Sequence, residues 1–273
     1  MSATAATRSS FLLAAAALLA LAACSGGEAE TTPTNDFDPA EFTGTPACDT
    51  RTFEGSRFTV CPFDGTKEEI RLAWRGSDGQ PLRSLAALEA SLGEKARQVR
   101  FAMNAGMYDE EGAPIGLFVE DGEERKSLNS REGGGNFHLL PNGVFAVNGE
   151  GHVSVTPTKQ FRKHVPSPRW ATQSGPMLVI DGKLHPKFDA NGPSQLVRNG
   201  VGVRDPKTAF FVISEDGVSF GRFARFFRDA LGCKDALYLD GSVSSLWDPG
   251  AGRQDAFSEL GPMIVVFSRR AGS

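Results

Sequence analysis

The chain has 273 residues, a formal net charge of −4 and 40% hydrophobic residues. This weakly acidic balance argues against a nucleic-acid partner, because domains that bind nucleic acid carry a basic surface. Its 31 glycines predict many tight turns and hence a strand-rich fold.

The N-terminus has the pattern of an export signal. The apolar run at residues 11–21 is too short to form a membrane-spanning helix, and it leads into Ala22-Ala23-Cys24, which is typical of a lipobox. We therefore expect residues 1–23 to be a lipoprotein signal peptide and Cys24 to be lipidated. Residues 24–46, rich in Ser, Gly, Glu, Thr and Pro, are expected to form a disordered tether. The alternative is an ordinary signal peptide cut after Ala23, with Cys24 incidental.

Lipid chains on Cys24 would give a stable membrane anchor. Ser25 rather than Asp follows the cysteine, and by resemblance to Gram-negative lipoproteins this indicates the outer membrane, facing the periplasm. Export permits disulfides, and the closeness of Cys48 and Cys61 in the sequence favours a bridge between them, worth about 3 kcal/mol by loop entropy. Cys233 is then left as a buried free thiol.

Residues 47–270 read as one domain. Alternation or apolar runs predict strands at 70–74, 99–103, 177–180, 201–203, 209–213, 236–239 and 263–267, and Asn142-Gly143 predicts a hairpin over 137–147. Residues 84–98, which Ser84 can cap, and 219–231 carry apolar side chains at helical spacing. Many strands and two helices without regular alternation predict the α+β class, with mixed or antiparallel sheets in a single domain.

Three predicted strands end in polar, glycine-rich turns, where rigid strands often place functional groups. In the first, Asn104 can donate and accept, and Gly106 lets the backbone approach a ligand. In the second, Arg198 is a bidentate donor suited to phosphate or carboxylate. In the third, Asp240 is costly to bury unless it is paired or catalytic, and the residues after it can cradle an anion with backbone N–H groups. The remaining candidate binding residues are Gln173, Ser174, Gly175, Asn199, Gly241, Ser242 and Ser244.

Each candidate also has a structural interpretation. Asn104 is suited to an Asx-turn, Arg198 to a surface ion pair and Asp240 to a β-turn, while Gln173 and Ser174 suit ordinary turn hydrogen bonding. A triad of Ser174 with His185 and Asp240 is conceivable, although nothing in the spacing demands it. The four histidines show no zinc-type spacing, and no metal or cofactor is predicted.

Taken together, these motifs resemble the phosphodiester glycosidase family over residues 48–268. The resemblance is carried, in this order, by residues 102–108, 114–117, 135–137 with 141–145, 171–176, 198–202 and 239–242. Animal-type members have Asn-Gly-Gly where this chain has Asn104-Ala105-Gly106, and Asp-Gly-Gly-Gly-Ser where this chain has residues 240–244. The chain therefore looks like a bacterial lipoprotein branch of the family.

The resemblance implies a hydrolase that cleaves a sugar from a sugar-1-phosphodiester in the cell envelope, without a cofactor. Asp240 would act as general base or nucleophile, and Arg198 would hold the phosphate with N–H groups near Gly241 and Ser242. Asn104 and Gln173 would orient sugar hydroxyls. One carboxylate suffices because the phosphate leaving group is already acidic. The rival interpretations are a non-catalytic envelope lipoprotein that binds a glycan, and a protease or esterase using Ser174.

Overall fold

The computed structural model describes residues 45–269, in which every strand pairing is antiparallel. The expected signal peptide, Cys24 and most of the expected tether lie outside these residues. None of the described helices is long and apolar enough to cross a membrane.

The largest sheet has seven strands and carries the segments around Arg198 and Asp240. Its order is β1-β2-β13-β12-β14-β10-β11. The strands are β1 (Asp49–Phe53), β2 (Ser56–Asp64), β10 (Met177–Ile180), β11 (Lys183–Leu184), β12 (Asn199–Asp205), β13 (Thr208–Ser214) and β14 (Asp235–Tyr238).

Two five-stranded sheets complete the α+β fold. The first has the order β16-β15-β4-β17-β3, and the second β6-β5-β9-β7-β8. The strands of the first are β3 (Glu68–Ala73), β4 (Val99–Asn104), β15 (Leu246–Asp248), β16 (Arg253–Gln254) and β17 (Met263–Ser268). Those of the second are β5 (Phe118–Glu120), β6 (Glu123–Lys126), β7 (Gly143–Val147), β8 (Val153–Pro157) and β9 (Trp170–Ser174).

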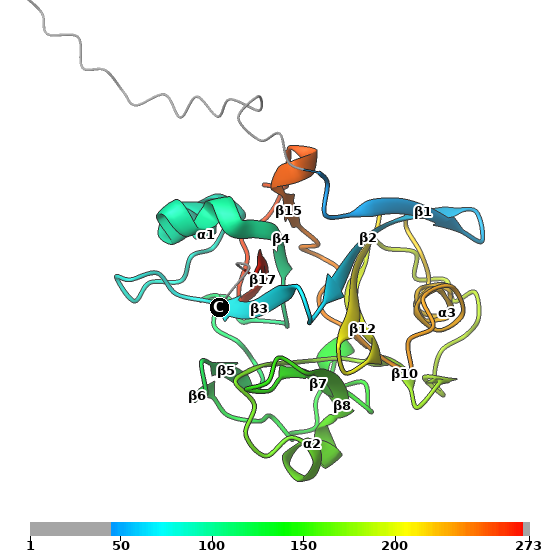
Figure 1. Cartoon of the computed structure of the whole chain (residues 1–273). Helices are drawn as coiled ribbons and strands as arrows, with labels where there is room; N and C mark the ends of the chain where they lie inside the picture. The colour runs from blue at the N-terminus through cyan, green and yellow to red at the C-terminus, as the bar shows by residue number, and fades with distance from the viewer. Residues whose placement is uncertain (1–44, 270–273) are drawn as a thin grey trace, which may run out of the picture. The chain divides into compact units, whose positions relative to one another are not determined.

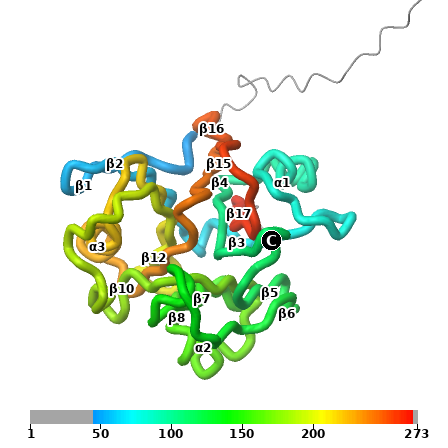
Figure 2. The backbone as a smooth tube through the Cα atoms, turned by 180° about the vertical axis from the view of Figure 1, so that it is seen from behind, coloured from blue at the N-terminus to red at the C-terminus, as the bar shows by residue number. Residues whose placement is uncertain are grey.

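One inner core is shared by all three sheets, and each sheet has a helix on its outer face (Figure 1). Period-two alternation produces this division: Phe101 and Met103 of β4 enter the shared core, while Ala102 faces the outside of its sheet. Helix α1 (Leu85–Leu92) packs on the outer face of the first five-stranded sheet. Helix α2 (Thr158–His164) packs on the second five-stranded sheet, and α3 (Phe220–Arg225) packs on the seven-stranded sheet. The view from behind shows the same three helices at the periphery (Figure 2).

The two predicted helices are present but change type along their length. Ser84 caps α1, accepting a hydrogen bond from the Ala87 N–H at 3.0 Å, and the chain continues from Gly93 to Gln98 as a 3-10 helix. Ser219 caps α3 in the same way, and residues Phe226–Ala230 form a π-turn. The third helix, α2, was not predicted from the sequence, because one buried Phe161 anchors its seven residues and no side chain caps it.

The hairpin predicted over 137–147 is wrong. β7 pairs with β8 and β9, while residues Asn136–His138 form a single 3-10 turn. The side chain of Asn142 explains the difference, because its Nδ2 donates to the Phe137 carbonyl at 2.9 Å and folds the preceding segment back as a loop.

The predicted disulfide between Cys48 and Cys61 is confirmed. Cys48 directly precedes β1, whose Asp49 pairs with Val60 of β2, so the register sets the two cysteines opposite each other. Cys233 is a buried free cysteine, and burial raises the pKa of its thiol to about 12, which makes it unreactive.

Candidate active site

The ends of β4, β12 and β14 meet at a network of side-chain amides. The Asn199 Oδ1 accepts a hydrogen bond from the Asp240 backbone N–H at 2.8 Å, and its Nδ2 donates to the Asn104 Oδ1 at 2.9 Å. The Asn104 Nδ2 donates in turn to the Asp240 carbonyl at 3.5 Å. Both asparagines are buried, so this network fixes the backbone on which the Asp240 carboxyl stands.

The Asp240 carboxyl is half-buried and forms no ion pair with any residue of the described range. Its Oδ1 accepts one hydrogen bond, from the Ser242 N–H at 3.1 Å. Burial raises the pKa of Asp240 to about 6, and the Ser242 hydrogen bond opposes that shift. Because a carboxyl with a pKa near the working pH exchanges protons readily, this group is suited to acid–base or nucleophilic chemistry.

The turn after Asp240 requires the glycine found there. A Cβ on Gly241 would lie 2.3 Å from the Tyr238 hydroxyl and 2.7 Å from the Val197 carbonyl. The Ser244 Oγ donates to the carbonyls of Asp240 and Gly241 at 3.1 and 3.2 Å, while Ser242 is exposed. The close approach of Tyr238 and the Ser244 hydrogen bonds thus define the shape of this turn.

Residues 97–266 match the family model of the phosphodiester glycosidases. The chain belongs to the phosphodiester glycosidase family. It is 37% identical to the uncharacterized protein YigE of Escherichia coli K12 over 195 residues. The matched segment covers 71% of this chain and 74% of YigE. Its fold is similar to that of the zebrafish N-acetylglucosamine-1-phosphodiester alpha-N-acetylglucosaminidase catalytic domain, auto-inhibited there by a pro-peptide, with a TM-score of 0.55, 14% identity and 82% of each chain covered.

Arg198 differs from the open phosphate clamp expected in this family member. Its side chain is fully buried: Nε donates to the Val218 carbonyl at 2.8 Å, and Nη2 donates to the carbonyl and hydroxyl of Ser194 at 3.0 Å. The guanidinium lies over the Phe220 ring, with Cζ 3.7 Å from its centroid, and Nη1 has no partner among the described residues. Burial lowers the pKa of Arg198, and no carboxylate among residues 45–269 forms an ion pair with it.

The Gln173 side chain is committed to the protein rather than open to a sugar. Its Oε1 accepts from the N–H groups of Leu117 and Asn129, each at 2.9 Å, and its Nε2 donates to the Asn129 carbonyl and the Thr158 hydroxyl. Every donor and acceptor of the amide is used. The expected role in orienting sugar hydroxyls is therefore replaced by a structural one, in which Gln173 ties distant loops to β9.

Gly106 and Gly175 are sites of close packing. A Cβ on Gly106 would lie 2.4 Å from the Gln173 carbonyl, and one on Gly175 would lie 2.6 Å from the Asn142 Cβ. The Gly106 N–H donates to the Thr172 Oγ1 at 3.3 Å, which joins the loop after β4 to β9. Both glycines allow segments of different strands to touch, and neither provides open room for a ligand at its Cα.

The structure contradicts the triad of Ser174, His185 and Asp240. The Ser174 hydroxyl is buried and donates to the Leu239 carbonyl at 2.6 Å. His185 is stacked on Phe188, and its Nδ1 accepts from the Lys187 N–H at 3.2 Å. Ser174 thus supports the strand that leads to Asp240.

Both tyrosines of the chain flank Asp240, and the sequence analysis did not single them out. Burial raises the pKa values of Tyr108 and Tyr238, the latter to about 12, and the nearby Asp240 charge adds to both shifts. The Tyr108 hydroxyl donates to the Glu259 carbonyl at 2.5 Å. Their sequence positions, next to the Asn104 and Asp240 motifs, were the available signal.

A hollow of about 280 Å³ borders residues 241–244. Arg253 lies in its lining, paired with Glu215 at 2.7 Å and with Asp255 at 2.9 Å. Val197 and Phe257 also line it, with 40% and 84% of their surfaces exposed. Both side chains are therefore accessible to a group that enters the hollow.

Within residues 45–269, no group of three or more His, Cys, Asp and Glu side chains is arranged to hold a metal ion.

Proposed function

We propose that this protein hydrolyses a sugar-1-phosphodiester, releasing the free sugar and a phosphate monoester. Membership of the phosphodiester glycosidase family supports this proposal. The observation that carries it is the Asp240 carboxyl, which is half-buried, has no ion-pair partner in the described range and has a pKa of about 6. The amides of Asn104 and Asn199 hold the backbone of Asp240 in place.

In the proposed reaction the ionised Asp240 acts at the anomeric carbon. As general base it removes a proton from a water molecule, whose oxygen bonds to that carbon while the carbon–oxygen bond to phosphate breaks. As nucleophile it first forms a glycosyl ester, which water then hydrolyses. In both routes the bonding electrons leave on a phosphate oxygen, an acidic leaving group that needs little proton donation.

The turn at residues 241–244, which borders the hollow, is proposed to receive the diester phosphate. The Ser242 N–H is already used by the Asp240 carboxyl, but the Ser242 side chain is exposed and its hydroxyl can donate to a phosphate oxygen. We assign Arg198 a positioning role, because its three donated hydrogen bonds fix residues 194–218 beneath this turn.

The test is turnover by the purified protein of a synthetic methyl diester of N-acetylglucosamine 1-phosphate. Release of reducing sugar together with methyl phosphate, followed by NMR, supports the proposal. Saturable binding of the diester without any release favours the rival interpretation, a glycan-binding protein on the same fold. A fluorophosphonate probe, which labels activated serines, should leave Ser174 unmodified because its hydroxyl is buried.

We also propose that the chain is an exported lipoprotein anchored through Cys24 in the outer membrane, where its substrate is an envelope glycan. The signal pattern of residues 11–25 supports export, and the Cys48–Cys61 disulfide fits an oxidising compartment. Metabolic labelling with palmitate should tag the wild-type protein and leave Cys24→Ala unlabelled, and labelled protein should sediment with outer membranes.

A further inference from the structure

A cavity of about 490 Å³ lies at the opposite end of the sheets from Asp240. Gln98, just before β4, lines it, whereas Asn104 at the far end of β4 belongs to the candidate active site. Trp170 of β9 and Phe267 of β17 also line the cavity, and each lies at the end of its strand that is remote from the candidate active site. Because β4 has six residues, roughly 17 Å of strand separates the two locations.

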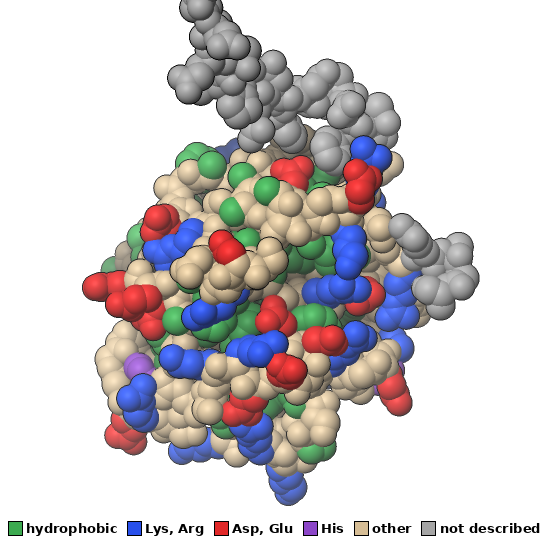
Figure 3. Space-filling model, turned by 90° about the vertical axis from the view of Figure 1, so that its left-hand side faces the viewer, with side chains coloured by type: hydrophobic (Ala, Val, Ile, Leu, Met, Phe, Trp, Pro, Cys, Tyr) green, Lys and Arg blue, Asp and Glu red, His purple; other side chains and the backbone are tan. Residues whose placement is uncertain are grey.

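We call this cavity the cationic pocket, because four of its lining side chains are cationic and two are acidic. On the face shown in Figure 3, cationic and acidic side chains are interspersed, and the whole chain carries a net charge of −4. An excess of two positive charges at one cavity is thus a local feature. The cations are Arg71, Lys95, Arg169 and Arg269, and the acids are Glu68 and Glu69.

Both carboxylates and two of the four cations are engaged in ion pairs. Glu69 pairs with Arg71 of the same pocket at 2.9 Å, and Arg169 pairs with Asp121, outside the lining, at 2.7 Å. Glu68 accepts the Asp64 N–H at 2.9 Å and pairs with Arg100 at 3.5 Å. Lys95 has no ion-pair partner among the described residues, and Arg269 donates its Nε to a backbone carbonyl, that of Glu68. The charges of Lys95 and Arg269 therefore remain unneutralised by any described carboxylate.

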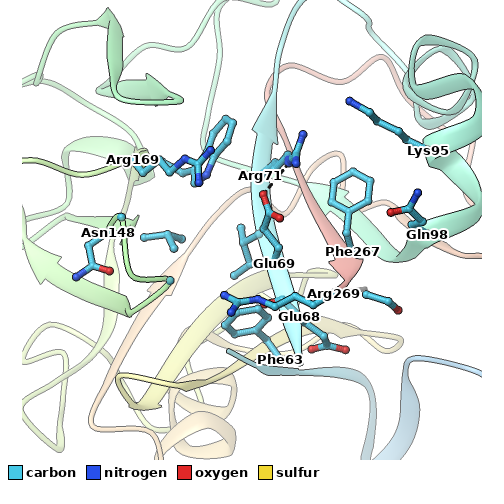
Figure 4. Close-up of a pocket in the computed structure, with 16 residues that line it drawn as sticks. Phe63, Glu68, Glu69, Arg71, Lys95, Gln98, Asn148, Arg169, Phe267 and Arg269 are labelled. Carbon is cyan, nitrogen blue, oxygen red and sulfur yellow. Dashed lines mark hydrogen bonds and ion pairs between the residues drawn. The ribbon is translucent and has the colours of Figure 1, made fainter. Parts of the chain in front are cut away.

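Two of the three arginines of the cationic pocket are held against aromatic rings. Arg71 lies over Phe267 and Arg169 over Trp170, with distances of 5.4 and 5.8 Å from Cζ to the ring centroid. Figure 4 shows Arg71, Arg169, Lys95 and Arg269 placed around the cavity, with the amides of Gln98 and Asn148 at its sides. Such bracing lowers the entropy lost when a guanidinium binds an anion.

We propose that the cationic pocket is a second binding site, which takes a saccharide carrying a phosphate or carboxylate group. Its volume is in the range of small-ligand sites. The Lys95 ammonium and the Arg269 guanidinium, which pair with no described carboxylate, bind the anionic group, and the Gln98 and Asn148 amides hydrogen-bond sugar hydroxyls. The site lies apart from Asp240, so the proposal goes beyond the hydrolase activity and does not depend on it.

Isothermal titration of the purified full chain tests this site with glucose 6-phosphate, glucuronate and neutral glucose. We expect saturable binding of at least one anion, the tighter anion identifying the group that the pocket prefers. Binding should weaken by about tenfold or more in the double variant Lys95→Gln with Arg269→Gln, since two charge-assisted hydrogen-bond donors to the anion are lost. Lys183→Gln, an exposed lysine on β11, is the matched control and should bind as wild type does.

The same titration in Asp240→Asn separates this site from the active site. Anion binding that persists in Asp240→Asn and falls in the double variant supports the second site, whatever the outcome of the turnover experiment. The proposal is overturned if neither anion binds, if glucose binds equally well, or if Asp240→Asn abolishes binding. It is also overturned if the protein binds phosphatidylglycerol vesicles through Lys95 and Arg269 while ignoring both soluble anions.

Discussion

The Asn199 side-chain oxygen accepts a hydrogen bond from the Asp240 backbone N–H at 2.8 Å. This contact joins the first residue of β12 to the residue that follows β14 by two positions, and it makes the neighbouring strand a support for the reactive carboxyl. The same amide also donates to Asn104, so one side chain sets the relation between two sheets.

Replacing Asn199 with Ala should therefore lower both stability and activity. The change leaves the Asp240 N–H without its partner and removes one of the two hydrogen bonds to the Asn104 Oδ1, which keeps the Ser245 N–H, and this costs about 1 to 3 kcal/mol of unfolding free energy. Urea unfolding measures the effect, and Asn191→Ala, at an exposed position, is the control. An unchanged unfolding midpoint would show that this network does not hold the site.

Asp240→Asn should make the protein more stable at neutral pH. The raised pKa of Asp240 means that ionisation opposes folding, and this cost grows as the pH rises from about 4 to about 6 and is complete above that range. A shift of about two pKa units corresponds to about 3 kcal/mol at pH 7.5, falling to about 1 kcal/mol at pH 4.5. The Asn oxygen can still accept the Ser242 N–H.

Thermal unfolding of wild type and Asp240→Asn at these two pH values checks this sign. Asp189→Asn, an exposed carboxyl, should give no difference at either pH. A variant less stable than wild type at pH 7.5 would mean that the carboxylate is stabilised in the folded state by a group that opposes the effect of burial.

Arg198→Met should chiefly impair folding rather than select against charged substrates. It removes the three hydrogen bonds that Arg198 donates to Val218 and Ser194 and its contact with the Phe220 ring, at a cost of about 1 to 3 kcal/mol. Activity on a sugar-1-phosphodiester and on a neutral aryl glycoside should then fall together. Arg204→Met is the control, since that arginine also donates to a carbonyl and lies over a ring, but is exposed. A stable variant that loses only the charged substrate would restore the direct phosphate clamp.

The exposed ring of Phe257 should contribute to binding of the group on the far side of the phosphate. Phe257→Ala is expected to raise KM for an octyl diester of the sugar phosphate by about five- to tenfold, because part of the octyl group loses its apolar contact with the ring. KM for the methyl diester is the internal control and should stay the same. Equal KM values for the octyl diester in wild type and variant would remove the hollow from the substrate path.

Several features of the fold were predictable because they depend on local pattern. The strand ending at Asn104 follows from its apolar run, and the Cys48–Cys61 bridge from closeness in sequence. The 137–147 hairpin failed because Asn142 bonds to Phe137 instead of forming the turn. Turn residues alone cannot reveal which partner an asparagine side chain finds.

The candidate site was predictable where a single residue follows a single strand, as with Asn104 and Asp240. It was not predictable where the partners are remote in the chain. Arg198 donates to the carbonyl of Val218, which is 20 positions away in the sequence. The Gln173 amide oxygen accepts from the N–H of Leu117, which is 56 positions away. Nothing in the local sequence around either residue distinguishes a buried structural donor from an exposed ligand-binding one.

Rates of sugar release from the methyl phosphodiester between pH 4 and 8, in wild type and Asp240→Asn, test the central claim most directly. The account predicts that kcat/KM of the wild type rises with pH to a plateau, with a midpoint near the Asp240 pKa of about 6. It predicts that Asp240→Asn, although folded, loses about a thousandfold or more of that activity at every pH. A folded Asp240→Asn enzyme that keeps the wild-type rate and pH profile would contradict the account.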